Sequence, residues 1–279
     1  MNILEKFMVV LDTKMPEPTL FGWFHIMWLA IMILGTVFVC LKCKNFSDKQ
    51  FRLFLLISCS VLILLEILKQ LVHSFDIESG TWDYAWKQFP FQFCSTPMYI
   101  GLIIALIKDG KIRDSLCSFL GTFGLFAGLI VMVYPTTVLS DVIFRSTQSL
   151  LHHCTMVIMG ALIWTTKKAK VEHKTILKGM AVFAVLVITA FVMNIIFHIS
   201  GGTDSFNMFY IGPYSKCDLP VLNNIGQALD LARQTIHIGN FIFLLIYIVG
   251  FTLAAYIILL VVMLVHKLIK KQKERISHD

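Results

Sequence analysis

Long apolar stretches recur along this chain, and most are long enough to cross a lipid bilayer as a helix. A helix that crosses the hydrocarbon core needs about 20 mostly apolar residues. The sequence contains seven such stretches, at residues 20–41, 52–73, 95–107, 116–134, 149–165, 176–198 and 241–265. The third stretch is short and contains Pro97, so we expect it to be tilted or partly broken and buried in protein. The pattern predicts an all-α integral membrane protein, a bundle of seven transmembrane helices.

The composition supports a membrane protein without a soluble domain. Of the 279 residues, 57% are hydrophobic and only 15% are charged, whereas soluble domains carry about 25% charged residues. We therefore interpret residues 1–279 as a single transmembrane domain. The net charge of +7 would suggest nucleic-acid binding in a soluble protein. Here the basic residues flank apolar spans, so no nucleic-acid partner is predicted.

The distribution of Lys and Arg predicts the orientation. Seventeen of the 24 lie near alternate connections and in the C-terminal tail, and six lie in the other connections. Cytoplasmic loops carry the excess of Lys and Arg, so the N-terminus is predicted outside and residues 266–279 form a basic cytoplasmic tail. We expect a multi-pass protein of the cell membrane, and a solvated tail is favoured over one that binds anionic lipid.

The seven Cys residues predict neither disulfides nor a metal site. Their number is odd and their spacing is scattered, so they form no disulfide framework. Cys40 and Cys43 form a CxxC pair, but a second pair is missing from the sequence. No metal and no organic cofactor is predicted.

Polar side chains gather in the predicted outer half of the spans. An ionisable residue inside a span is costly and indicates a functional site by default. These residues are Glu66, Lys69, His152, His153, Asn194 and His198. A structural ion pair between Glu66 and Lys69 has about equal weight, and His198 is also compatible with an ordinary interfacial histidine. Two adjacent imidazoles point about 100° apart on a helix, so we expect at least one of His152 and His153 to have a role in the site.

Cys94 is the sharpest single candidate. Ser95 or Thr96 is a good N-cap and Pro97 suits a first helical turn, so Cys94 is predicted to sit at a helix N-terminus. Free N–H groups and the helix dipole favour a thiolate there. A nearby imidazole would complete an activated nucleophile; a lone membrane Cys is otherwise an inert small hydrophobe.

Several motifs resemble one known family. Phe89-Pro90-Phe91-Gln92-Phe93-Cys94-Ser95-Thr96-Pro97, Tyr134-Pro135, His152-His153 and Asn207-Met208-Phe209-Tyr210-Ile211-Gly212-Pro213 look like the YwaF-type integral membrane proteins. That family includes an animal branch of cysteine-dependent phospholipid acyltransferases. The resemblance implies a membrane acyltransferase with Cys94 as nucleophile and His152 as its base. Many family members have His where this chain has Gln92.

We therefore expect an acyl group to move between phospholipids and lysophospholipids through a Cys94 thioester. Hydrogen bonds to the oxyanion are expected from Gln92, Asn194 or Asn207; the only partners predicted are these membrane lipids, and no protein partner is indicated. The main alternative is a seven-helix transporter or a lipid- or ligand-binding protein that uses the same polar cluster. A third interpretation is a scaffold or accessory subunit, in which the cluster serves packing alone.

Overall fold

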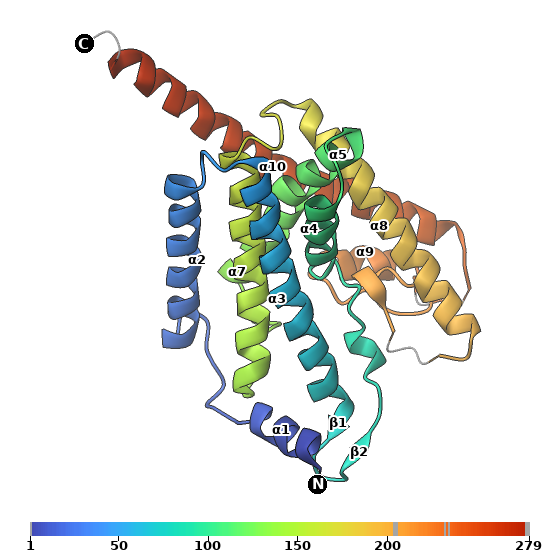
Figure 1. The fold of residues 1–279 in the computed structure, drawn as a ribbon. Coiled ribbons are helices and arrows are strands. Elements are labelled where there is room, and N and C mark those ends of the chain that lie inside the picture. Colours follow the sequence, from blue (N-terminus) through green and yellow to red (C-terminus); the bar gives the residue numbers. More distant parts are fainter. Residues whose placement is uncertain (1, 203–205, 232, 234, 277–279) are drawn as a thin grey trace.

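The structure is a computed structural model that describes residues 2–202, 206–231, 233 and 235–276, and it is almost entirely helical (Figure 1). Within this described part, five helical runs are long and apolar enough to cross a membrane. They are α2 (Trp23–Lys42), α3 (Asp48–Ser74), the run Lys111–Val133, α8 (Lys174–Ile199) and α10 (Ile238–Ile276). The predicted all-α class is therefore confirmed.

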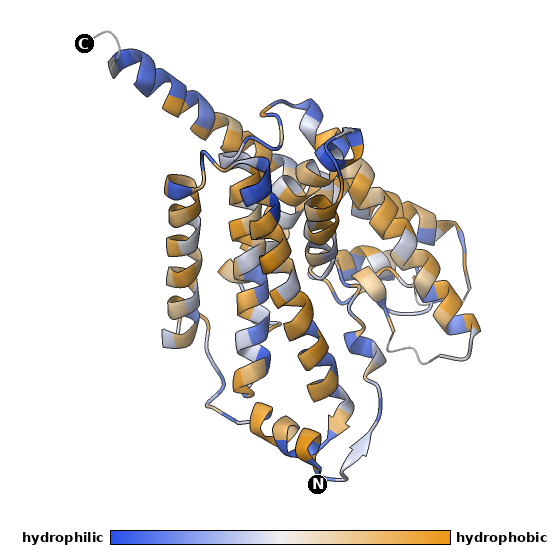
Figure 2. Cartoon of the chain, in the orientation of Figure 1, coloured by the Kyte–Doolittle hydropathy of each residue, from blue (hydrophilic) through white to orange (hydrophobic). Residues whose placement is uncertain are grey.

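Two further helices occupy the remaining predicted stretches. α7 (Ile143–Thr165) lies beside α2 and α3 in the bundle, and its N-terminal half carries several polar residues (Figures 1 and 2). α4 (Thr96–Leu106) has only 11 residues, so it extends about 16 Å at 1.5 Å per residue. That is about half of the 30 Å hydrocarbon core, and it agrees with the expectation of a broken third span.

The run Lys111–Val133 contains an irregularity that the sequence analysis missed. α5 (Lys111–Phe119) passes through a five-residue π-helix, η2 (Leu120–Gly124), into α6 (Leu125–Val133). The Trp164 indole N–H donates to the Gly121 carbonyl at 2.7 Å, and the Thr122 hydroxyl donates to the Ser118 carbonyl at 2.6 Å. The two side chains thus give hydrogen bonds to the carbonyls of Gly121 and Ser118, at and beside the π-helix. Short π-helices occur often at functional sites.

Small elements lie between the long helices and at the end of the bundle that holds the N-terminus. They are α1 (Ile3–Leu11), β1 (Phe75–Asp76), β2 (Thr81–Trp82), η1 (Trp86–Gln88), η3 (Met208–Tyr210) and α9 (Leu222–Ala228). α1 begins with a capping box between Asn2 and Glu5, and its buried Met8 packs against Val72 and Phe75. The N-terminal segment therefore closes one end of the bundle (Figure 1).

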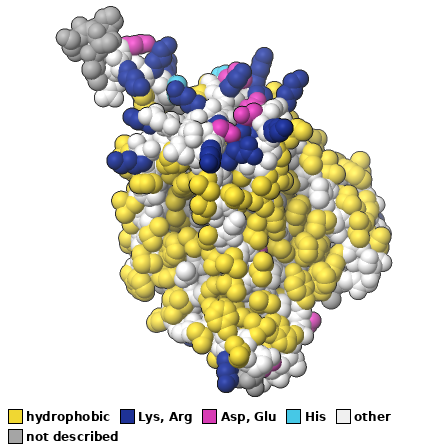
Figure 3. Space-filling view, viewed as in Figure 1, with side chains coloured by type: hydrophobic (Ala, Val, Ile, Leu, Met, Phe, Trp, Pro, Cys, Tyr) yellow, Lys and Arg dark blue, Asp and Glu magenta, His cyan; other side chains and the backbone are white. Residues whose placement is uncertain are grey.

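The opposite end carries most of the Lys and Arg residues. In Figure 3 the Lys and Arg side chains gather there, beyond a broad hydrophobic surface, and Figure 2 shows the same band of apolar helix. Asp48 accepts hydrogen bonds from Arg113 at 2.8 Å and from Lys168 at 2.5 Å. Arg52 donates to the carbonyls of Ala105 and Leu106 at 2.7 and 2.9 Å. It thereby satisfies carbonyls at the C-terminal end of α4.

Two glycines allow close packing around α6. A Cβ atom on Gly128 would lie 2.9 Å from the His153 carbonyl oxygen, and one on Gly124 would lie 3.7 Å from Pro97. At the other end of the chain, α10 has 39 residues and projects beyond the bundle (Figure 1). Residues 266–276 of the predicted basic tail continue it as helix.

Candidate functional site

Cys94 lies at the start of the half-length helix, inside the bundle. Ser95 occupies the N-cap position, as predicted, although its side chain makes no capping bond, and Pro97 lies in the first turn. Arg52 bonds to the other end of α4, near the charged end of the bundle, and α4 is about half as long as a helix that crosses a membrane. The chain at residues 89–95, just before α4, is not helical.

His152 comes from α7 and contacts this non-helical segment. Its Nε2 lies 2.9 Å from the carbonyl oxygen of Cys94, and the imidazole is only 4% exposed. A carbonyl oxygen accepts only, so Nε2 carries the proton and Nδ1 is the basic nitrogen. Two residues that the sequence separates by 58 positions thus meet, and the hydrogen bond joins His152 to the peptide of Cys94 rather than to its thiol.

Glu66 and Lys69 form an ion pair in the last turns of α3. Lys69 Nζ lies 2.7 Å from Glu66 Oε1, and the Glu66 side chain is almost completely buried. The amides of Gln70 and Gln148 donate to the two carboxylate oxygens at 2.8 and 3.4 Å. Lys69 also acts electrostatically on both Cys94 and His152. The ion pair therefore belongs to the surroundings of Cys94 as well as to the packing of α3.

The sequence analysis did not single out Gln70 or Gln148. Each lies four residues from a residue that it did select, Glu66 and His152 respectively. Positions four apart share a helix face, so this spacing was the signal that could have found them.

A second non-helical segment, residues 206–217, meets the first one through Gln92. The Gln92 amide donates to the Asn207 carbonyl at 3.0 Å and accepts from the Phe209 N–H at 2.8 Å. Asn194 on α8 does the same for Met208, donating to its carbonyl at 3.0 Å and accepting from its N–H at 2.7 Å. Both side chains therefore hold backbone that has no helical partner.

Asn207 closes the same segment on itself. Its Oδ1 accepts from the Gly212 N–H at 2.8 Å and its Nδ2 donates to the Lys216 carbonyl at 2.9 Å. The three amides that we expected to face an oxyanion thus each bond to the backbone at both ends. We call Gln92, Asn194 and Asn207 the amide clamps.

The clamped segment contains backbone strain. Phe209 and Tyr210 have φ values of 59° and 58°, in the left-handed region that non-glycine residues seldom adopt. Each such residue costs about 1–3 kcal/mol and persists only where its surroundings hold it, often at functional sites. The Phe209 ring also lies against Phe93, with ring centroids 5.9 Å apart. The strain is therefore stored directly beside the Cys94 segment.

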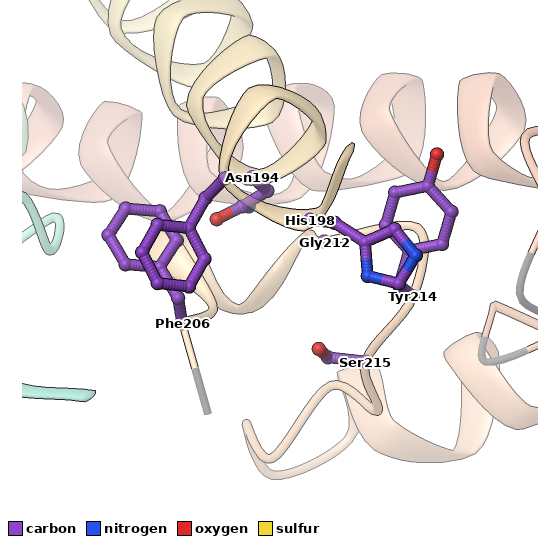
Figure 4. Close-up of a pocket in the computed structure, with 7 residues that line it drawn as sticks. Asn194, His198, Phe206, Gly212, Tyr214 and Ser215 are labelled. Atoms are coloured by element: carbon purple, nitrogen blue, oxygen red, sulfur yellow. The ribbon is translucent and has the colours of Figure 1, made fainter. Parts of the chain in front are cut away.

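His198 lies in a separate pocket near the end of α8 (Figure 4). Its ring stacks on Tyr214 with centroids 3.7 Å apart, and Ser215 and Gly212 also line this pocket of about 210 Å³. Asn194 lines it too, which connects the pocket with the clamped segment. Much of this volume is open to solvent, and the enclosed part has room for about one water molecule, which is far too small for a phospholipid acyl chain.

His153 points away from Cys94, in agreement with the expected 100° between the two imidazoles. Its Nδ1 donates to the Ser149 carbonyl at 2.7 Å and its Nε2 has no hydrogen-bond partner among the described residues. His152 and His153 therefore serve two different parts of the bundle. Within the described residues, no group of three or more His, Cys, Asp or Glu side chains is arranged to hold a metal ion.

Comparison with known proteins gives one match. The model of the TMEM164 family matches residues 20–263. The chain belongs to the TMEM164 family. No curated protein and no solved structure matches it. The matched region begins just before α2, ends within α10 and contains Cys94, His152 and the amide clamps. With its apolar helices, this TMEM164-family chain is a multi-pass membrane protein.

Proposed function

We propose that this TMEM164-family protein is a membrane acyltransferase that moves a fatty acyl group between phospholipids and lysophospholipids. The observation that carries the proposal is the meeting of Cys94 and His152 at the N-terminus of a half-length helix, in a bundle that also buries the Glu66–Lys69 ion pair. A nucleophile, a base and a positive charge are the groups that acyl transfer needs. The motifs shared with YwaF-type proteins, which include cysteine-dependent acyltransferases, support the same assignment.

In the first half-reaction, Cys94 Sγ attacks the ester carbonyl carbon of a phospholipid. His152 leaves the Cys94 carbonyl so that its Nδ1 reaches the thiol and takes the thiol proton, and the positive charge of Lys69 offsets the negative charge on the tetrahedral oxygen. The C–O bond then breaks, the proton passes from His152 to the leaving alkoxide, and a lysophospholipid departs. The acyl group remains on Cys94 as a thioester.

In the second half-reaction, the hydroxyl of another lysophospholipid attacks the thioester carbonyl carbon. His152 Nδ1 accepts the hydroxyl proton, the C–S bond breaks, and the proton returns to the Cys94 thiolate. The two half-reactions together consume one phospholipid and one lysophospholipid and form one of each. The reaction needs no oxidant, metal or acyl-CoA.

The amide clamps have a positioning role in this proposal. Since Gln92 ties the residues before Cys94 to the strained segment at Phe209, the clamps fix the nucleophile's backbone. This replaces the oxyanion role expected for them from the sequence, and Lys69 takes that role instead.

We further propose that all seven helical stretches cross or enter the membrane of the cell, with the N-terminus outside and the basic end of α10 inside. The gathering of Lys and Arg at one end of the bundle supports this orientation (Figure 3). Cys94 would then be reached from the outer leaflet, so membrane phospholipids are the acyl donors.

A lipid- or ligand-binding protein or transporter is the second candidate. Half-length helices whose N-termini lie at membrane depth are typical of transporter binding sites, and α4 has this form. The two proposals differ in one respect, because binding alone does not require a reactive thiol at position 94.

Thiol reactivity therefore separates the two proposals. The purified protein is treated with a lipid-like thiol-reactive probe, as wild type, Cys94→Ala and His152→Ala. Cys94 is half-buried, whereas Cys59, Cys117 and Cys154 are buried, and Cys154→Ala serves as the control. We expect selective labelling of Cys94 that slows roughly 100-fold or more without His152. If Cys94 reacts no faster than Cys59, or equally fast in His152→Ala, binding or transport becomes the better assignment.

A further inference from the structure

Two buried polar atoms of opposite hydrogen-bonding sense are left without partners at the junction of α2, α6 and α7. They are Nε1 of Trp28, which can only donate, and Nε2 of His153. The two residues are 7% and 3% exposed. Neither atom has a hydrogen-bond partner among the described residues, although buried polar groups are nearly always paired.

The packing of α2 on α7 places Trp28 and His153 at the same level. A Cβ atom on Gly35 would lie 2.5 Å from Ile158, and the Thr165 hydroxyl lies 3.6 Å from Cys40 Sγ. The residue numbers differ by 123 in the first contact (158 − 35) and by 125 in the second (165 − 40). Because this difference stays nearly constant along the chain, the two helices run parallel. The same offset places Trp28 level with residues 151–153.

His153 also lies on the face of α7 that packs against the hydrophobic cluster around Trp28. At 100° per residue, positions 150, 153, 154 and 157 lie within about 100° of the circumference of α7. Leu150, Cys154 and Val157 belong to the hydrophobic cluster that contains Trp28. His153 is therefore on the face of α7 that packs against this cluster, and His152 is on the opposite face.

α6 provides the third wall of the junction. Gly128 brings α6 against the His153 carbonyl, and the Nε2–H of His25 on α2 donates to the Met132 carbonyl on α6 at 2.8 Å. The Phe21 N–H donates to the other ring nitrogen of His25 at 3.0 Å. His25 is thus satisfied and structural, while Trp28 and His153 have unused hydrogen-bonding capacity.

His153 must accept at Nε2. Its Nδ1–H already donates to the Ser149 carbonyl, so in the neutral ring Nε2 holds a lone pair. Trp28 needs an acceptor and His153 needs a donor. A hydroxyl group supplies both, because its oxygen accepts and its hydrogen donates. A carbonyl or an ammonium group supplies only one of them.

We propose that the α2–α6–α7 junction binds a hydroxyl group that bridges Trp28 and His153. The hydroxyl belongs either to a buried water molecule or to the free glycerol hydroxyl of a lysophospholipid that enters between α2 and α6. An unpartnered buried polar group is destabilising, which favours occupancy of the site. The proposal lies beyond acyl transfer and is independent of Cys94.

Indole N–H resonances test the site directly. The full-length protein is labelled with ¹⁵N-tryptophan and ¹⁵N-histidine, placed in lipid nanodiscs that contain a lysophospholipid and compared with Trp28→Phe, which identifies the Trp28 resonance among five Trp residues. We expect a hydrogen-bonded indole shift with a cross-peak to water or to lipid glycerol protons. A cross-peak to glycerol protons that disappears in deuterated lipid identifies the lipid as the ligand. A cross-peak at the water frequency that persists in deuterated lipid identifies water.

His153→Leu and His153→Gln complete the test. Leu removes the acceptor, so the Trp28 cross-peak should be lost, while Gln keeps an acceptor and should retain it. If His153→Leu fails to fold, the wild-type spectra with and without deuterated lipid still show whether a hydroxyl group is bound at Trp28. A Trp28 resonance at the shift of a free indole, without either cross-peak, would overturn the proposal. So would ¹⁵N–¹⁵N coupling to His153, which would show a direct bond between the rings.

Discussion

Buried side chains in this protein divide into those that could be placed from the sequence and those that could not. The pairing of Cys94 with His152 was expected from the resemblance to YwaF-type proteins, although the observed bond joins His152 to the peptide of Cys94. An ion pair of Glu66 with Lys69 was one of two interpretations of their spacing. The partners of Gln92 could not be predicted, because they lie on residues 207 and 209 of a distant non-helical segment. Sequence spacing predicts contacts within a helix but not contacts between two irregular segments.

The amide clamps should contribute measurably to stability. Asn194→Ala leaves the N–H of the buried Met208 without its Asn194 partner, and leaves its carbonyl with only the long 3.5 Å bond from the Ile211 N–H. We expect the free energy of unfolding to fall by roughly 1–3 kcal/mol, the cost of one orphaned buried group. Thermal or denaturant unfolding in detergent measures this. Gln227→Ala is the control, because Gln227 is exposed and bonds only to Asn223, and an equal loss in both variants would contradict the clamping role.

His237 should titrate above the usual range. Its Nδ1 lies 3.0 Å from the Thr235 carbonyl and its Nε2 lies 3.0 Å from the Leu229 carbonyl. Both nitrogens must donate, which only the protonated ring can do, and these bonds raise the pKa of His237 above 6.5. Because the folded pKa is the higher one, the stabilisation is complete below the unfolded pKa and is lost as pH rises through the folded pKa.

Two measurements check this pH dependence. Ring NMR titration should give a pKa above 6.5 for His237, and proteolysis of the chain between α9 and α10 should accelerate as pH rises through that pKa. His237→Gln should remove the pH dependence of cleavage. A measured pKa at or below 6.5 would show that the imidazolium is not held by the two carbonyls.

Helix positions were largely predictable, and their irregularities were not. Each predicted apolar stretch coincides with helix, and the short third stretch became the half-length α4. The π-helix η2 escaped prediction because it depends on a tertiary bond from Trp164 to Gly121. α1 and α9 escaped because helices of nine and seven residues are too short to give a membrane-spanning signal.

Close packing of α6 on α7 should make Gly128 intolerant of a side chain. Gly128→Ala would place a Cβ atom 2.9 Å from the His153 carbonyl oxygen, and overpacking of this kind costs about 1–3 kcal/mol. Gly250 in α10 has no neighbour within 4 Å, so Gly250→Ala should instead stabilise its helix by roughly 0.5–1 kcal/mol. Unfolding in one detergent measures both. Changes of the same sign would contradict the packing.

In the whole molecule, most Lys and Arg residues lie at one end, and the N-terminal segment closes the other end (Figures 1 and 3). This difference between the two ends supports the proposed orientation. This asymmetry was predictable from the distribution of Lys and Arg. The closing of the other end by α1 and the β1–β2 hairpin was not, because short amphipathic segments have no distinctive pattern in an apolar sequence.

Labelling from the two sides of the membrane should confirm the orientation. Ser79→Cys lies in the hairpin and Lys170→Cys lies between α7 and α8, and both positions are exposed. In cells with Cys40 replaced by Ala, an impermeant maleimide should label the first without permeabilisation and the second only after it. The reverse pattern would invert the orientation, and labelling of both from outside would contradict the bundle.

The central claim is that Cys94 carries an acyl group between lipids, and the intact mass of the protein tests it most directly. The purified protein is incubated with a phospholipid of one defined acyl chain and quenched in acid. We predict a mass increase of that acyl group on Cys94, which neutral hydroxylamine or a lysophospholipid removes. The adduct should be absent from Cys94→Ala and present in Cys154→Ala. An unchanged mass, or an equal adduct in Cys94→Ala, would contradict the acyltransferase account.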